Sequence, residues 1–265
     1  MIEFRNVTKS FNDEVVLKDV SFRITKGETK IILGASGSGK STILKLILGL
    51  IKPESGRIII EDEEITQMDE RELGRIRRAI GMVFQEGALF DSLSVRENVG
   101  YRLYEEGQIS EEEIEAAVGR LLGFVGLEEA IDKMPAELSG GMKRRVGIAR
   151  ALVGTPKVVL YDEPTAGLDP VTKRTIVELM IKLRDLEGVT SVFVTHDLPA
   201  AAVIATQYAV TDGDGDVRVV SGGDTLCLAN IRFIMLHEGS ICFQGSYEEL
   251  KDSNHPYVRY FVYAS

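Results

Sequence analysis

A glycine-rich run set between a strand pattern and a helix pattern constrains this chain more than any other feature. It reads Gly34-Ala35-Ser36-Gly37-Ser38-Gly39-Lys40-Ser41, with a strand-like stretch at residues 30–33 before it and a helical pattern from Thr42 after it. Glycines let backbone N–H groups converge on an anion, and the helix N-terminus adds the positive end of its dipole. At this spacing Lys40 can reach the outer phosphates of a nucleotide, and the Ser41 hydroxyl can ligate Mg²⁺. Glycines that only made a tight turn would not need both flanks, so the sequence predicts a site for a nucleoside triphosphate.

Strand and helix patterns alternate along the chain, which predicts an α/β protein. Residues 2–7 and 15–24 alternate apolar and polar side chains and predict two strands joined through Asn12-Asp13, hence a small antiparallel sheet. Helical patterns dominate after Gln85 to about Val153, which predicts an inserted helical subdomain. In it, Ser139 is expected to cap a helix, and the run Lys143-Arg144-Arg145 is expected to be exposed.

Charge and composition exclude some classes of function. A formal net charge of −10 argues against a broad nucleic-acid surface, which needs clustered Lys and Arg. The two cysteines, Cys227 and Cys242, lack metal-ligand or redox spacing and are typical of ordinary thiols in a reducing compartment. The longest apolar stretch, residues 43–51, is far shorter than the ~20 residues of a membrane span, and no leader pattern opens the chain. If the protein acts at a membrane, we expect another chain to span it.

Polar side chains follow three predicted core strands. Gln85 follows residues 80–84, Asp162 and Glu163 follow residues 157–161, and His196 follows residues 191–195. Ligands bind outside the carboxyl ends of strands in open α/β sheets, so we expect these side chains to converge. Each has an ordinary alternative when taken alone, because a histidine after a strand is usually a satisfied polar group and Asp-Glu-Pro can simply start a loop.

Taken together and in this order, the motifs resemble those of the nucleotide-binding subunits of ATP-binding-cassette (ABC) transporters. The resemblance covers residues 1 to about 207 and 232–251. It rests on the loop at 34–41, Gln85, Leu138-Ser139-Gly140-Gly141-Met142, the strand ending at Glu163, Ala166-Gly167-Leu168-Asp169 and His196. It implies one domain over residues 1–265. Its parts are a P-loop NTPase (RecA-like) core at 1–85 and 154–251 that includes the N-terminal antiparallel β subdomain, a helical signature subdomain at 86–153 and a C-terminal extension at 252–265.

The resemblance also implies a homodimer assembled head to tail, with each ATP between the phosphate loop of one copy and Ser139 to Gly141 of the other. Asp162 would hold Mg²⁺ through water, with Ser41 as a ligand, and Gln85 would sense the metal and the attacking water. Glu163 would polarise that water and His196 would contact the γ-phosphate. None of these is a covalent nucleophile, which suits phosphoryl transfer. The implied nucleotide contacts are Phe11, Gly34, Ser36, Gly37, Ser38, Gly39, Lys40, Ser41, Thr42, Ser139, Gly140, Gly141 and Asp169.

Phe11 is predicted to lie in the turn between the first two strands. An aromatic ring there can pack at the edge of the sheet or stack on an adenine base, and the residues alone leave both open. The ABC resemblance favours stacking.

A narrower resemblance links the chain to the ATPases of MCE-type lipid transporters. It rests on Gln85 to Phe90, Met134 to Glu137 and Pro256 to Phe261. It implies membrane permease subunits and an MCE-type substrate-binding component as partners, and a phospholipid or another lipid as the transported substrate. It also implies a peripheral location on the cytoplasmic face of the inner membrane, with the C-terminal extension packed on the partner ATPase.

Residues 208–231 are an insertion relative to the ABC family. Asp212-Gly213-Asp214-Gly215-Asp216 resembles a calcium loop at first, but Val217 stands where that loop needs glycine and Gly223 where it needs glutamate. We favour Asp-Gly turns that join strands at 217–220 and 225–229, in a hairpin that extends the sheet.

Other functions share some of these motifs. An ABC ATPase could serve another substrate, and an ATP-switched interaction protein could regulate a membrane complex without transport. A DNA-repair or translation ATPase predicts coiled coils, tandem cassettes or basic patches, which the sequence lacks.

Overall fold

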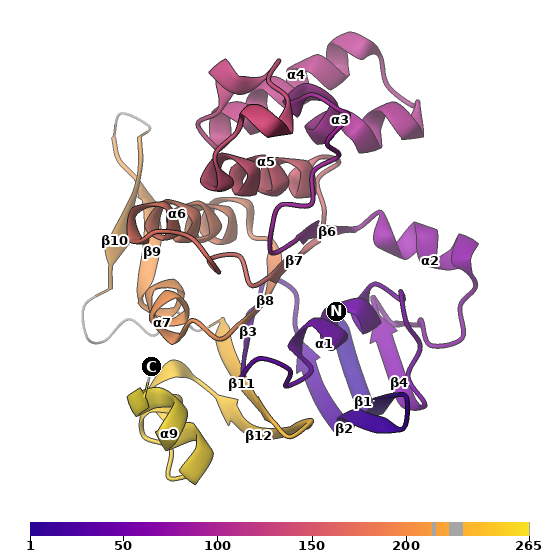
Figure 1. Ribbon diagram of the computed structural model, residues 1–265, viewed down its shortest axis with the longest axis vertical. Coiled ribbons are helices and arrows are strands. Elements are labelled where there is room, and N and C mark those ends of the chain that lie inside the picture. The colour runs from indigo at the N-terminus through magenta and orange to yellow at the C-terminus, as the bar shows by residue number, and fades with distance from the viewer. Residues whose placement is uncertain (214–215, 223–229, 265) are drawn as a thin grey trace.

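The computed structural model describes residues 1–213, 216–222 and 230–264 and centres on a six-stranded sheet in the order β12-β11-β3-β8-β7-β6 (Figure 1). Its strands are β3 (Thr29–Leu33), β6 (Ile80–Val83), β7 (Val158–Asp162), β8 (Thr190–Thr195), β11 (Ile231–His237) and β12 (Ser240–Gly245). Neighbouring strands run parallel except β11 and β12. The α/β class predicted from the sequence is confirmed.

All five residues of strand β3 are buried. Successive side chains of a strand point to opposite sides of the sheet, so both faces of β3 are covered. Ile31 and Leu33 join a core shared with the helices α6 (Pro170–Glu187) and α7 (Leu198–Thr206). Ile32 joins a second core on the other face, shared with the helix α1 (Lys40–Ile47). The near-continuous apolar strands of the sequence are therefore the middle layer between two cores.

A second, antiparallel sheet closes the α1 side of the molecule (Figure 1). Its strands are β1 (Ile2–Phe11), β2 (Glu14–Ile24), β4 (Ser55–Ile60) and β5 (Glu63–Glu64). Asn12 and Asp13 join β1 to β2 with φ of 47° and 65°, the left-handed backbone that a tight hairpin turn requires. The predicted hairpin is confirmed, but Phe11 is the last residue of β1 rather than part of the turn.

Helices separate β6 from β7 and form the subdomain at the top of Figure 1. They are α3 (Val95–Glu106), α4 (Glu111–Phe124), α5 (Gly140–Leu152) and the short 3-10 turns η1 (Glu128–Ala130) and η2 (Pro135–Glu137). Ser94 and Ser110 cap α3 and α4 with reciprocal bonds to a glutamate three residues later, and Ser139 caps α5. The helix α2 (Glu70–Arg77) precedes β6 and begins at a similar cap on Asp69.

Glycine allows α5 to approach the sheet and the loop after it. A Cβ added to Gly81 of β6 would lie 2.1 Å from the Ala151 carbonyl oxygen, and one added to Gly147 would lie 3.1 Å from the Gly87 Cα. These backbone contacts fix α5 against the loop that contains Gln85. The helical subdomain is thus packed on the core through α5.

The insertion forms a hairpin of β9 (Gln207–Thr211) and β10 (Val217–Ser221). The strand predicted at 217–220 is confirmed, and the one predicted at 225–229 lies outside the described residues. The partner of β10 is β9, which we did not predict, and within the described residues this hairpin is not part of the central sheet, contrary to our expectation. It is a separate two-stranded sheet fastened to α6, because Arg184 donates to the Gln207 carbonyl at 2.7 Å and Asp185 accepts from the Ala209 N–H at 2.7 Å.

Asp212 closes this hairpin by accepting from the Asp216 N–H and pairing with Arg218. No cluster of three metal-ligating side chains occurs in the part of the chain that the structure describes.

The chain ends in α8 (Tyr247–Lys251) and α9 (Pro256–Ala264). Tyr257 stacks on His237 with ring centroids 3.7 Å apart, and Val258 is fully buried. Tyr260 and Tyr263 are 71% and 74% exposed, which leaves a pair of rings on the outer side of α9.

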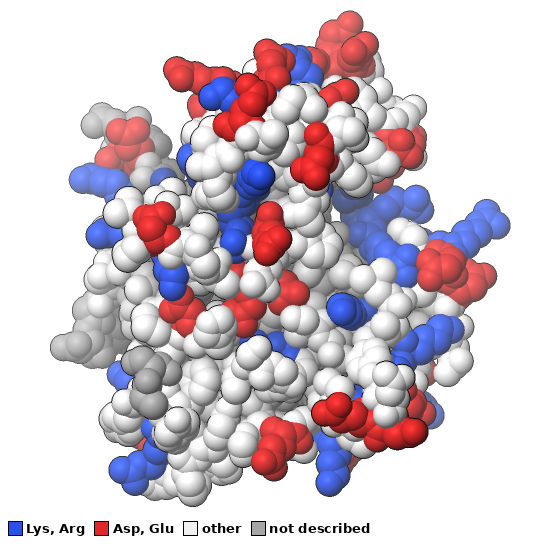
Figure 2. All heavy atoms as spheres, in the orientation of Figure 1, with Lys and Arg blue, Asp and Glu red and all other residues white. Residues whose placement is uncertain are grey.

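The surface is of mixed charge. Figure 2 shows acidic side chains gathered over the helical subdomain at the top of the view and basic ones scattered among them. Among the described residues, no helix is both long enough and apolar enough to cross a bilayer.

The contact between α5 and β6 gives a prediction about stability. The change Gly81→Ala should destabilise the fold by about 2 kcal/mol or more, because the new methyl group meets backbone that cannot move aside cheaply. Gly119→Ala is the matched control, since a Cβ there meets nothing within 4 Å and alanine favours the helix α4 by about 1 kcal/mol. Urea unfolding of both variants measures the difference, and equal midpoints would contradict the packing described.

Candidate nucleotide-binding and hydrolytic site

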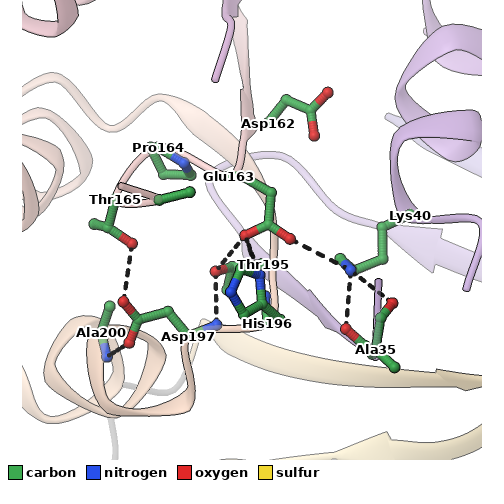
Figure 3. A network of polar contacts seen from close by, with 12 residues as sticks. Ala35, Lys40, Asp162, Glu163, Pro164, Thr165, Thr195, His196, Asp197 and Ala200 are labelled. Carbon is green, nitrogen blue, oxygen red and sulfur yellow. Dashed lines mark hydrogen bonds and ion pairs between the residues drawn. The ribbon is translucent and has the colours of Figure 1, made fainter. Parts of the chain in front are cut away.

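The phosphate loop connects β3 to α1 at the carboxyl edge of the central sheet. Gly37 and Gly39 have φ of 81° and 97°, which turns the loop around the start of α1. The Lys40 ammonium donates to the carbonyl oxygens of Gly34 and Ala35 at 2.9 and 3.0 Å (Figure 3). Its third contact is the Glu163 carboxylate at 3.3 Å, so the lysine charge already faces an anionic group in this structure.

Two further observations support a phosphate in this loop. The Ser38 Oγ is buried and has no hydrogen-bond partner among the described residues, although a buried hydroxyl normally has one. A Cβ on Gly34 would lie 2.5 Å from that Oγ and 2.8 Å from the Leu236 carbonyl oxygen, so only glycine fits there. An anion seated in the loop would satisfy the hydroxyl together with the N–H groups of the α1 N-terminus.

Ser41 and Asp162 form an oxygen pair beside the loop. The Ser41 hydroxyl donates to the Asp162 Oδ1 at 2.8 Å, across the gap between α1 and the end of β7. Burial raises the pKa of the Asp162 carboxyl, and the hydrogen bond from Ser41 works against that shift. A hydroxyl and a carboxylate are ligands that Mg²⁺ prefers, so the donor set fits this metal.

Glu163 lies at the centre of the site and is 9% exposed. Its φ of 46° is unusual for a residue with a side chain and costs on the order of 1 kcal/mol or more. The carboxylate accepts from the Thr195 hydroxyl at 3.1 Å and from the His196 N–H at 3.2 Å, and lies 3.0 Å from the His196 Nδ1 (Figure 3). The strand ends of β7 and β8 therefore bring an acidic and an imidazole side chain together, and the acidic one also contacts Lys40.

The turn after β8 is held by Asp197. This side chain caps α7 through the Ala200 N–H, pairs with Lys173 at 2.8 Å and accepts from the Thr165 hydroxyl at 3.2 Å. Burial raises its pKa, but these partners outweigh burial and hold the pKa below its usual value. His196 itself stays 57% exposed, so its ring can meet a ligand.

The structure brings together some of the predicted site residues and not others. Lys40, Ser41, Asp162, Glu163 and His196 are linked by the contacts above. Gln85 follows β6 at the same edge, but it is exposed, and no contact in the described chain joins it to this group. Its role, like those of Ser36 and Thr42, stays a prediction.

Ser139, Gly140 and Gly141 lie elsewhere. They begin α5, which Figure 1 shows in the upper subdomain well away from α1. Asp169 is exposed and accepts from the N–H groups of Val171 and Thr172, so its carboxylate caps α6 in this structure.

Phe11 is 42% exposed at the end of β1 and is not a member of either hydrophobic core. Its ring lies under the Lys9 ammonium, 5.0 Å from the centroid. Packing at the sheet edge therefore uses little of this ring.

Arg144 is buried, contrary to our expectation. The run Lys143-Arg144-Arg145 was expected to be exposed, yet Arg144 is 6% exposed and its guanidinium donates to the carbonyl oxygens of Glu163, Pro164 and Ala166. Sequence reasoning missed it because a basic triplet on a helix is typical of a solvated face. The missed signal is the helical period, which places Arg144 on the same side of α5 as the buried Gly147, Ile148 and Ala151.

An apolar cavity of about 400 Å³ opens between β6, α3 and α5. Phe84, Phe90, Tyr101 and Arg150 contribute to its lining. Phe90 and Tyr101 lie 4.7 Å apart between ring centroids, and the Arg150 guanidinium lies over the Phe90 ring. The cavity adjoins the loop that follows Gln85.

Comparisons with known proteins agree with this geometry. The family model described as ABC transporter matches residues 17–166. The protein TRIGALACTOSYLDIACYLGLYCEROL 3, chloroplastic, of Arabidopsis thaliana is 40% identical over 273 residues, covering 100% of this chain and 74% of that protein. The intermembrane phospholipid transport system ATP-binding protein MlaF of Haemophilus influenzae is 37% identical over 234 residues, covering 83% and 89%.

Other relatives carry a different substrate in their names. The methionine import ATP-binding protein MetN 1 of Pseudomonas fluorescens is 40% identical over 216 residues, covering 80% of this chain and 64% of that protein. Among solved structures, a dimeric ATP-binding cassette in a post-hydrolysis state with ADP and Pi superposes with a TM-score of 0.76 at 35% identity, covering 93% and 98%.

Proposed function

The chain belongs to the ABC transporter family as an ATP-hydrolysing, ATP-binding subunit, and we propose that two copies clamp ATP between them to drive a lipid-transporting membrane permease. The observation that carries the proposal is the grouping of Lys40, Ser41, Asp162, Glu163 and His196 at one edge of the sheet. A charged loop, an oxygen pair and a carboxylate with an imidazole neighbour are the parts that phosphoryl transfer requires.

Each residue has a role in ATP hydrolysis. Backbone N–H groups of Gly37, Gly39 and Lys40 bind the phosphates, with Gly34, Ser36, Ser38 and Thr42 shaping the loop. The Lys40 ammonium exchanges its Glu163 partner for the γ-phosphate, because its other two N–H donors are occupied by the Gly34 and Ala35 carbonyls. Freed from Lys40, the Glu163 carboxylate takes a proton from the attacking water, and His196 donates a hydrogen bond to the γ-phosphate.

Mg²⁺, when bound, would neutralise phosphate charge, and Ser41 and Asp162 would hold it, Asp162 through water. Gln85, in the loop after β6, would contact the metal and the attacking water. Phe11, whose ring is 42% exposed at the end of β1, stacks on the adenine.

The N-terminus of α5 is a second place that can bind an anion, and its position supports a dimer. Ser139 and Gly140 are exposed at the start of α5 and Gly141 is half-buried, and α5 lies well away from α1, which begins at Lys40, in the same copy. They reach a γ-phosphate only if they come from another copy, with Asp169 at the same contact. The related cassette that was solved as a dimer with ADP and Pi supports this arrangement.

The permease docks in the cavity lined by Phe84, Phe90 and Tyr101. This surface is apolar, and it adjoins Gln85, so a change at the nucleotide can be relayed to it. We place the subunit on the cytoplasmic face of the membrane, where ATP is available. An MCE-type component would complete the complex, and the exposed rings of α9 would pack on the partner ATPase.

Two names favour a lipid substrate, since MlaF belongs to a phospholipid transport system and the Arabidopsis relative is named for a galactolipid. A second candidate is import of another small substrate, favoured by the MetN relative. The motifs alone would also suit an ATP-operated switch that transports nothing.

Replacing Glu163 should separate ATP binding from hydrolysis. In Glu163→Gln, turnover should fall by about 100-fold or more because the base is lost. ATP should still bind, and dimers should accumulate in size-exclusion chromatography because the nucleotide that joins them persists. Glu187→Gln, an exposed position at the end of α6, is the control and should behave as the parent protein. Turnover at the parent rate in Glu163→Gln would remove the proposed base.

Lipid transport is tested with the complete complex in vesicles. The subunit and its permease are reconstituted with fluorescent phospholipid, with radiolabelled methionine in a parallel sample. We expect ATP-dependent movement of the phospholipid that Glu163→Gln abolishes. Movement of methionine alone would favour the import function, and ATP hydrolysis without movement of either would favour the switch.

A further inference from the structure

Arg144 connects the helix α5 to the loop that carries Glu163. Its Nη1 donates to the carbonyl oxygens of Glu163 and Pro164 at 3.2 and 2.8 Å, and its Nη2 donates to that of Ala166 at 3.0 Å. All three acceptors lie in the turn that leaves β7. One guanidinium therefore binds three carbonyl oxygens of the first four residues after β7.

This arrangement is costly for stability. Within the described chain Arg144 forms no ion pair, and its buried Nε has no hydrogen-bond partner. Desolvation lowers its pKa, which shows that burial works against the charged form. A buried cation hydrogen-bonded to carbonyl oxygens, with Glu86 near enough only to offset part of the desolvation, stabilises the fold poorly compared with an apolar side chain of similar size. Stability alone gives no reason to place arginine here.

The backbone of Glu163 gives a reason. Its φ of 46° is strained, and such a conformation persists only where several contacts impose it. The Glu163 N–H donates to the Val194 carbonyl at 2.9 Å, which fixes one side of the residue. Arg144 fixes the other side through the Glu163 and Pro164 carbonyls. The direction of the Glu163 side chain toward Lys40 and His196 depends on both.

We propose that Arg144 is a positioning residue that holds Glu163 in its strained backbone conformation and joins it rigidly to the helix that begins at Ser139. This inference rests on the proposed role of Glu163 as the base. Since Ser139 is proposed to meet the ATP of the other copy, α5 then links the nucleotide at one site to the base at the other.

The neighbouring arginines on α5 show what is special about Arg144. Arg150 donates to the carbonyls of Gly87 and Ala88, which follow Gln85 in the loop after β6. Arg145 donates to the carbonyls of Val125 and Gly126, within the helical subdomain and away from the site. Arg145 makes the same kind of bonds from the same helix, so it is a matched control.

The test compares Arg144→Met with Arg145→Met in the complete transporter complex. Arg144→Met should lower kcat by about 10- to 100-fold with KM for ATP within 2-fold, because Glu163 is displaced while the phosphate loop is untouched. Arg145→Met should keep kcat within 2-fold. Arg144→Lys, whose ammonium can reach one or two of the three carbonyls, should recover part of kcat.

Two further measurements separate this role from a structural one. Both Met variants should show similar thermal midpoints, and adding Arg144→Met to Glu163→Gln should leave ATP-driven dimers intact. Equal kcat in the two Met variants, or a loss in Arg144→Met that resides in KM or in folding, would overturn the proposal. If instead Glu163→Gln keeps the parent turnover, the role of the base fails first, so the two failures are distinguishable.

Discussion

The parallel register of β3, β8 and β7 is the constraint on which the site depends. Leu33 pairs with Thr195 and Asp162 pairs with Val194, so the three strands end at nearly the same level. The loop after β3 supplies Lys40, the turn after β7 supplies Glu163 and the turn after β8 supplies His196. A slip of one residue in any strand would turn these side chains to the other face of the sheet. Two apolar cores, one on each face, hold the register.

Helix α5 is the second organising element. It begins at Ser139, passes the catalytic turn at Arg144 and ends against β6 near Ala151. Its arginines bond to backbone carbonyls of the loops after β7 and β6, and glycines at 81, 87 and 147 let it approach closely. A shift of this helix therefore has to move both loops. Through such a rigid link between packed elements, a change at one nucleotide would reach distant surfaces.

Much of the fold and part of the site could be predicted because they depend on patterns within short stretches of the sequence. The glycine spacing of residues 34–41 and the polar residues at strand ends identified Lys40, Asp162, Glu163 and His196. Arg144 was predicted to be exposed, but it is buried against the turn after β7. That turn lies about 20 residues farther along the chain, so the sequence around Arg144 does not reveal the contact. The strand at 217–220 was predicted, but its pairing with β9 was not, and the docking of β9 on α6 depends on Arg184 and Asp185, which carry no local signal of that contact.

The central claim is that each ATP site is shared by two copies, and mixing two damaged copies tests it most directly. In the Glu163→Gln background, one sample also carries Lys40→Ala and the other Ser139→Phe, with donor and acceptor fluorophores on the two samples. A dimer of either variant alone is damaged in both of its ATP sites. In a mixed dimer, one site combines the intact Lys40 of the Ser139→Phe copy with the intact Ser139 of the Lys40→Ala copy. We predict ATP-dependent energy transfer in the mixture, and only monomers in size-exclusion chromatography of each sample alone. A mixture without energy transfer, or Ser139→Phe protein that dimerises unaided, would contradict the account.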